Sequence, residues 1–261
     1  MPSEYLEHLI YAPVPNRGYR VRATSPGVTE SEFLDAAKGY FAPFDQNLFD
    51  GDLEARMVIG SASTIYLSRI LQRPRLDELK RSGVVCHMVE IPIAMFSAGL
   101  TFREVNNAMV SFESSQHEVP KGNMPELPVK WESKGDNKDY DLTEMASSIP
   151  EDAARRIIMA FNGESPRVFV LSKTGGWSKR TDLVYAISKF LILCGIKSFS
   201  VTSECPIDDI MGFEGLVVVS SYIPSLSGHS GWTVVNLSNK EKQAQSPNAA
   251  RADDVIRGIY S

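Results

Sequence analysis

The stretch RMVIGSASTIYLSRIL, residues 56–71, decides the fold of the first part of this chain. Its two ends, residues 56–59 and 64–71, are rich in β-branched and other apolar side chains, which favours strands. Between them lie Gly60, Ser61, Ala62 and Ser63, which are small residues suited to a tight reversal of the chain. The stretch therefore predicts a β-hairpin, and the apolar run at residues 84–91 predicts a further strand of the same meander.

Two more strands are expected before this meander. Residues 5–12 are rich in apolar side chains, residues 19–23 alternate in strand fashion, and the Pro-, Asn- and Gly-containing residues 13–18 predict a turn between them. Residues 29–32, Thr-Glu-Ser-Glu, have the pattern of a capping box and predict a helix that runs to about residue 41. A second capping box, Thr-Phe-Arg-Glu at residues 101–104, predicts another helix after the meander.

The predicted order of the first part is strand, strand, helix, three strands, helix. A helix between a two-strand and a three-strand meander allows one antiparallel sheet to form with its helices packed beside it. We therefore expect residues 1–115 to form an α+β domain.

A change of composition marks the end of this domain. Residues 116–141 contain three prolines, four lysines and six acidic residues, with little periodicity. Because proline fixes φ and has no backbone N–H group, this stretch is predicted to be an extended connector. The chain then divides into a first domain at 1–115, a connector at 116–141 and a second domain at 142–261.

Strands and helices alternate in the second domain. The predicted strands are residues 167–171, 198–203, 216–222 and 232–237, and the predicted helices are residues 153–161, 181–194, 207–211 and 249–260. Such alternation is typical of α/β layers with parallel strands. We expect a smaller α/β layer here, so the chain as a whole is predicted to combine α+β and α/β structure.

Composition excludes several classes of protein. The chain has 261 residues, with 27 Lys plus Arg against 32 Asp plus Glu, and it lacks the basic excess of nucleic-acid-binding proteins. Three cysteines without a CxxC pair favour a reducing, cytoplasmic compartment. The most apolar stretch, residues 183–196, contains Lys189 and is too short to span a membrane.

The segment YAPVPNRGYRVRATSPG, residues 11–27, resembles the N-terminal region of prokaryotic GTPase-associated proteins. In that family an aromatic strand leads through a loop to a Gly-aromatic strand and then to an SPG turn before a helix. The order of elements is also similar to that of longin and roadblock domains, and proteins of this family are compared with the longin-plus-DENN architecture of eukaryotic GTPase regulators. The resemblance implies a longin-like first domain and a small GTPase as partner. The matching positions are Tyr11, Gly18, Tyr19, Ala23, Ser25, Pro26 and Gly27.

The same segment also has a simple local interpretation. Pro26 followed by Gly27 predicts a type II turn, in which Gly27 has a positive φ. We therefore expect Gly27→Ala to destabilise the chain by about 1 kcal/mol through backbone strain. Gly18 is likewise expected to have a positive φ in the turn between the two strands.

Three arginines of this segment are candidate partner-binding residues. Arg20 and Arg22 are two residues apart on a predicted strand, so they share one face and are suited to pair with acidic groups of a partner. Arg17 lies in the preceding loop. The other interpretation of these arginines is a solvated outer face of the strand.

Residues 173–180 suggest an alternative function. This segment follows a predicted strand and precedes a predicted helix, which is where α/β folds bind anions. It does not match the Walker A pattern, and an ordinary polar loop is the other interpretation. The candidate anion-binding residues are Lys173, Thr174, Gly175, Gly176, Ser178, Lys179 and Arg180.

No pattern in the sequence predicts a catalytic or metal site. Residues 228–232, Gly-His-Ser-Gly-Trp, lack the last glycine of a nucleophile elbow. The four histidines are scattered, and the paired aspartates at 208–209 and 253–254 lie at predicted helix starts, where acids favour the helix dipole.

These observations lead to a non-enzymatic protein-interaction module that associates with a small GTPase or a GTPase-containing complex, without a cofactor. The alternative is a phosphate- or nucleotide-binding α/β protein, enzymatic or not, that uses residues 173–180. A third interpretation is a structural subunit without a ligand. The oligomeric state is left open by the sequence.

Overall fold

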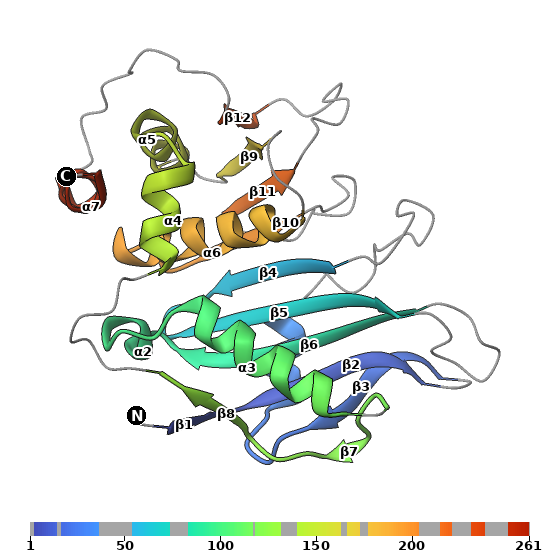
Figure 1. Cartoon of the computed structure of the whole chain (residues 1–261). Helices are drawn as coiled ribbons and strands as arrows, with labels where there is room; N and C mark the ends of the chain where they lie inside the picture. Colours follow the sequence, from blue (N-terminus) through green and yellow to red (C-terminus); the bar gives the residue numbers. More distant parts are fainter. Residues whose placement is uncertain are drawn as a thin grey trace. The chain divides into compact units, whose positions relative to one another are not determined.

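The computed structural model describes residues 3–14, 17–36, 54–73, 83–116, 118–131, 140–162, 166–172, 177–203, 215–220, 231–237 and 250–260. The chain forms two compact units, the first of residues 1–57 and 63–137 and the second of residues 58–62 and 138–261. Both units contain helices and strands, as Figure 1 shows, so the predicted mixed α and β class is confirmed.

The first unit is built on one large sheet. Its strands are β1 (Ser3–Leu6), β2 (His8–Val14), β3 (Gly18–Thr24), β4 (Glu54–Gly60), β5 (Thr64–Arg73), β6 (Gly83–Pro92), β7 (Gly122–Asn123) and β8 (Leu127–Lys130). Within this unit the strand order is β4-β5-β6-β2-β3-β7. β6 pairs antiparallel with β5 and β2, and β2 pairs antiparallel with β3. β1 and β8 pair antiparallel in a separate two-stranded sheet.

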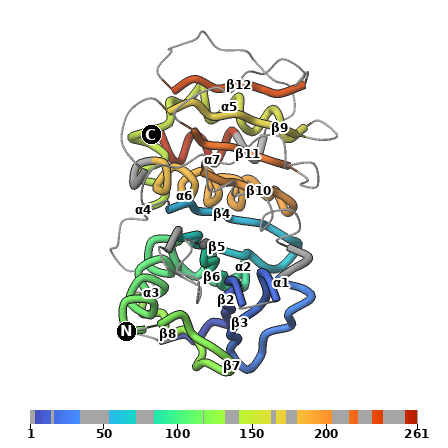
Figure 2. The backbone as a smooth tube through the Cα atoms, turned by 90° about the vertical axis from the view of Figure 1, so that its right-hand side faces the viewer, coloured from blue at the N-terminus to red at the C-terminus, as the bar shows by residue number. Residues whose placement is uncertain are grey.

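Three helices accompany this sheet, namely α1 (Glu30–Ala36), α2 (Ile93–Ser97) and α3 (Phe102–Ser115). In Figure 2, α3 and α1 lie on opposite faces of the sheet, so both faces are covered. Phe33 of α1 packs on Tyr66 of β5, with 5.2 Å between the ring centroids. The predicted order of two strands, a helix, three strands and a helix is present in β2 to α3, with β1 before it and the short α2 before α3 as additions.

The predicted capping box at the start of α3 is confirmed. The Thr101 hydroxyl accepts a hydrogen bond from the backbone N–H of Glu104 at 3.3 Å, and the Glu104 carboxylate accepts one from the backbone N–H of Thr101 at 2.8 Å. Three apolar side chains of α3, Phe102, Val105 and Met109, are buried, as their helical spacing predicts.

The segment predicted as a connector contributes β7 and β8 to the first unit. In β8, Leu127 and Val129 are buried whereas Pro128 and Lys130 are exposed, which is the alternation of a strand with one face on a core. The first unit accordingly extends to residue 137. Proline is compatible with β8 because the strand has a partner, β1, on one side only.

The second unit has a parallel sheet, which matches the α/β layer expected there. Its strands are β9 (Arg167–Leu171), β10 (Phe199–Ser203), β11 (Leu216–Ser220) and β12 (Thr233–Asn236), and its helices are α4 (Tyr140–Ser148), α5 (Glu151–Ala160), α6 (Trp177–Leu193) and α7 (Ala250–Tyr260). The order β12-β9-β11-β10 is parallel throughout. α6 packs on β10 and β11, and α5 packs on β9 and β12. The helix predicted at 207–211 lies outside the described residues.

Among the residues described by the structure, no helix is both long enough and apolar enough to cross a membrane.

Candidate functional site

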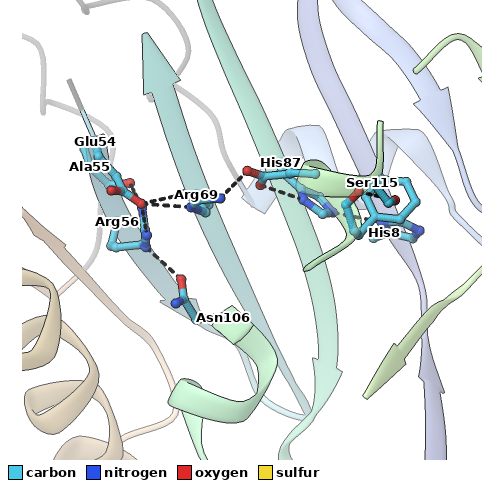
Figure 3. Close-up of polar contacts among 10 residues, drawn as sticks. His8, Glu54, Ala55, Arg56, Arg69, His87, Asn106 and Ser115 are labelled. Carbon is cyan, nitrogen blue, oxygen red and sulfur yellow. Dashed lines mark hydrogen bonds and ion pairs between the residues drawn. The ribbon is translucent and has the colours of Figure 1, made fainter. Parts of the chain in front are cut away.

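A series of buried and partly buried polar side chains crosses the face of the first sheet that α3 covers (Figure 3). Four adjacent strands, β4, β5, β6 and β2, each contribute to it, and α3 contributes two members. We call this series the polar row. Its members are His8, Glu54, Arg56, Arg69, His87, Asn106 and Glu113.

Strand register places the row on one face. Arg69 lies opposite His87 in the pairing of β5 with β6, and His87 lies opposite Ile10 in the pairing of β6 with β2. Residues opposite each other share a face, and so do residues two apart on one strand. His8 is two residues from Ile10 and therefore lies on the same face, diagonal to His87.

Arg69 lies between two carboxylates. Its Nε and Nη2 atoms are 2.9 and 2.8 Å from Glu54 Oε1, and its Nη1 atom donates to Glu113 Oε2. The side chains of Arg69 and Glu113 are only 12% and 11% exposed. At this degree of burial the two opposite charges attract strongly. Removing either side chain would leave the other charge uncompensated, which destabilises the fold.

Glu54 also forms an ion pair with the guanidinium group of Arg56, a second cation whose side chain is nearly fully buried. Arg56 Nε donates to Asn106 Oδ1 at 3.0 Å, which links β4 to α3. Although burial alone would raise it, the hydrogen bonds and charges of Arg56 and Arg69 together lower the pKa of the Glu54 carboxyl. Glu54 is thus held as a carboxylate between two guanidinium groups.

The histidine end of the row is shut away from solvent. His8 Nδ1 lies 2.8 Å from His87 Nε2, His8 Nε2 lies 2.7 Å from the carbonyl oxygen of Pro125, and His87 Nδ1 lies 3.0 Å from Glu113 Oε1. Phe112 of α3 covers both imidazoles, with ring centroids 4.9 and 5.5 Å away. His8 is 0% and His87 1% exposed. Burial first, and then the neighbouring His87, lower the pKa of His8 to about 4.

The polar row links several elements of the first unit. Each member binds another member or a backbone carbonyl, so the row joins four strands, α3 and the Pro125 segment through hydrogen bonds, of which those of Arg56 and Arg69 are charge-assisted. Within the described part of the chain, no group of three His, Cys, Asp or Glu side chains is placed to hold a metal ion.

The expectation that the histidines are scattered is wrong for His8 and His87. They are 79 residues apart in the chain, and only the pairing of β2 with β6 brings them together. The sequence carries no local signal for this contact, because neighbouring strands can pair in more than one order and register.

The resemblance segment forms the β2–β3 hairpin of the first unit. Gly18 has φ +70°, as predicted, and the Arg17 N–H closes the turn onto the Val14 carbonyl at 3.0 Å. Tyr11 and Tyr19 stack with 5.9 Å between centroids, and the Tyr19 hydroxyl accepts the Val84 N–H at 2.9 Å. These contacts anchor the exposed Tyr19 on the sheet.

The three candidate arginines all lie on this hairpin. Arg17 and Arg20 are exposed, and Arg20 Nε donates to the Arg17 carbonyl at 3.1 Å. Arg22 is half-buried and donates to the Pro13 carbonyl at 3.2 Å. The pairing register shifts by one residue at Arg22, which is the signature of a β-bulge.

The predicted type II turn at Pro26-Gly27 is wrong. Gly27 is not among the glycines with a positive φ, although the Val28 N–H reaches the Ser25 carbonyl at 3.4 Å. The turn is organised by Glu7, whose carboxylate accepts from the Ser25 hydroxyl and from the Gly27 N–H. A Cβ atom on Gly27 would meet this carboxylate, with Cδ at 2.7 Å, so Gly27→Ala would displace the end of the Glu7 side chain and not strain the backbone.

The predicted anion segment is described only in part. Residues 173–176 lie outside the described residues, whereas residues 177–180 form the first turn of α6, where Arg180 is buried. The segment does follow β9, as predicted, but the helix expected from residue 181 begins at Trp177, so residues 177–180 belong to the helix and do not precede it. The carboxyl ends of the four parallel strands meet at the same edge, where Ser172, Ser203, Ser220 and Asn236 lie at or next to the last strand residues.

No protein-family model matches this sequence, and no curated protein matches it.

Proposed function

We propose that this chain is a non-enzymatic interaction module that binds a small GTPase or a complex containing one, through the β2–β3 hairpin of its first unit. The observation that carries this proposal is the exposed group of Arg17, Tyr19 and Arg20 at one end of that hairpin. Tyrosine and arginine are enriched among the residues that dominate binding energy at protein interfaces. The guanidinium groups of Arg17 and Arg20 are suited to bind carboxylates on an acidic partner surface.

The hairpin holds these side chains in place before a partner arrives. Tyr19 is fixed by its stacking on Tyr11 and by the Val84 N–H, and Arg20 is fixed by the Arg17 carbonyl. A surface ordered in advance loses less side-chain freedom on binding, which favours affinity. The element order of the first unit also agrees with the longin-like architecture that the resemblance implies.

The experiment is a capture assay with the tagged full chain, in lysate loaded with GDP or with a non-hydrolysable GTP analogue, followed by binding to the identified GTPase in purified form. We expect a small GTPase to be enriched in one nucleotide state. Arg17→Glu/Arg20→Glu should weaken its binding at least tenfold. The control, Lys121→Glu/Lys130→Glu, reverses two exposed charges elsewhere in the first unit and should bind as the wild type does.

Two results contradict this proposal. One is the absence of any enriched GTPase in either nucleotide state. The other is a GTPase that binds the Arg17→Glu/Arg20→Glu variant as tightly as the wild type, which would leave a GTPase partner but remove the hairpin as its binding surface.

The alternative function is phosphate or nucleotide binding at residues 173–180. It is favoured by one observation, the four polar residues at the carboxyl edge of the parallel sheet beside the start of α6. Ligands of open α/β sheets bind outside that edge. Nucleotides should then raise the melting temperature of the wild type but not of Lys173→Ala/Lys179→Ala. An equal rise in both proteins would exclude these lysines.

A further inference from the structure

Three hydrogen bonds run in series through the histidine end of the polar row. They join the Pro125 carbonyl to His8, His8 to His87, and His87 to the Glu113 carboxylate, at 2.7, 2.8 and 3.0 Å. All three are of normal length, and the two imidazoles between them are shut off from water.

The protons in this series can be counted. A carbonyl oxygen only accepts, so His8 Nε2 must carry a proton. His8 is neutral at pH 7, because burial and His87 lower its pKa to about 4, so its Nδ1 atom is a bare acceptor. His87 Nε2 must then donate to it. The last contact, from His87 Nδ1 to Glu113, needs a proton as well.

We propose that His87 and Glu113 form a buried one-proton site, which holds one proton more than a neutral imidazole and a carboxylate carry together. Only with this third proton are all three hydrogen bonds of the series made. Arg69 donates to the other oxygen of Glu113, so the carboxylate form is favoured and the proton resides on His87. His87 is therefore an imidazolium between a carboxylate and a neutral histidine.

The charged groups around the site come from every element packed on it. On the far side of His87 they are Glu113 of α3 and Arg69 of β5, followed by Glu54 and Arg56 of β4. On the near side Glu7, just before β2, favours positive charge on His8, whereas His87 opposes it. A second proton on His8 would place two imidazolium groups in contact. Loss of the third proton of the series, the one shared by His87 and Glu113, would leave one hydrogen bond unmade.

The site therefore couples the proton to the packing of two segments on the sheet. Glu113 lies in the last turn of α3, and Pro125 lies between β7 and β8. One proton fewer leaves one bond of the series unmade, and one proton more on His8 sets it against His87, so either change weakens the series that links these segments to β2 and β6. We therefore expect these two segments to pack most firmly on the sheet over an intermediate range of pH.

The test is nitrogen-15 NMR of the histidine rings in the full-length protein, with resonances assigned through His8→Gln and His87→Gln. At pH 7 we expect His87 to show protons on both ring nitrogens and His8 to be the neutral Nε2–H tautomer. A neutral His87 with a single ring proton in the folded wild type at pH 7 would overturn the proposal.

A second variant gives a matched comparison. In Glu113→Gln the amide N–H₂ can donate to His87 Nδ1 while its carbonyl accepts from Arg69, so all three bonds are made with a neutral His87. We expect the signal of the second His87 proton to disappear in this variant at pH 7. Glu118→Gln, an exposed position just beyond α3, should leave the wild-type pattern unchanged. Retention of the imidazolium in Glu113→Gln would contradict the assignment of the proton to this pair.

Discussion

Arg69 is the residue on which the charge balance of the polar row depends most directly. It bonds Glu54 and Glu113 at once, and removing it takes from the largely buried Glu113 carboxylate its ion pair with a guanidinium group. We expect Arg69→Met to lower the free energy of unfolding by about 3–5 kcal/mol, the usual cost of breaking a buried ion pair from one side. Urea denaturation followed by circular dichroism measures this loss.

The double variant Arg69→Met/Glu113→Gln separates the charge effect from lost packing. Because it also removes the carboxylate that Arg69→Met leaves behind, it should be more stable than the single variant. A double variant less stable than Arg69→Met would show that the long side chain of Arg69 contributes mainly through packing.

His8 predicts a pH dependence whose sign follows from its burial. Its pKa is about 4 in the folded chain against an ordinary value of 6.5, so the unfolded chain binds the proton first as the pH falls. Its contribution to stability is complete above about pH 6.5 and is lost as the pH falls towards about 4, by a few kcal/mol in all. Urea midpoints of the wild type and of His8→Gln over this range should diverge, and parallel curves would contradict the prediction.

At the scale of single elements, α3 depends on its first turn. The Thr101 hydroxyl and the Glu104 carboxylate each satisfy a backbone N–H that the helix itself leaves without a partner. We expect Thr101→Ala to destabilise the chain by about 1 kcal/mol, whereas Thr101→Ser keeps the hydroxyl and should cost less than half as much. Thermal unfolding compares the two, and equal losses would mean that the methyl group of Thr101 matters and not its hydroxyl.

Two glycines in different elements should respond in opposite ways to alanine. A Cβ atom on Gly60, in the part of β4 that belongs to the second unit, would overlap the ring of Phe199, which is fully buried and cannot give way. Gly60→Ala should therefore cost about 1–3 kcal/mol. Gly258 of α7 has open space around it, and Gly258→Ala should stabilise the helix by up to about 1 kcal/mol. Chemical denaturation of both variants tests the contrast.

Local patterns in the sequence were enough to predict most elements but not the polar row. The hairpin around Gly60 and the capping box at Thr101 each depend on residues that are adjacent in the sequence, and both are present. β8 was missed because Pro128 within it and Pro125 just before it resemble a linker, although the alternation of Leu127 and Val129 with polar or proline positions was visible. The contacts among His8, Arg69 and His87 depend on which strands pair and in what register, and no local pattern specifies that.

At the scale of the whole molecule, the two units do not correspond to two continuous stretches of chain. Residues 58–62 belong to the second unit although the chain on both sides of them belongs to the first. A fragment of residues 138–261 therefore lacks part of its own unit, including Gly60 beside Phe199. We expect it to show weaker near-ultraviolet circular dichroism and a lower melting temperature than the second unit in the full chain. A fragment that melts at the full-chain temperature would contradict this.

The polar row has a consequence for how this protein changes over evolutionary time. A substitution of Arg69 alone leaves charge uncompensated in a buried place, and so does a substitution of Glu113 alone. Lineages that lose one of them are therefore expected to lose or exchange the other, so the two positions should covary among descendants of a common ancestor. Covariation of this kind persists after overall sequence identity has faded, and a distant relative would be recognised by the correlated columns of this pair.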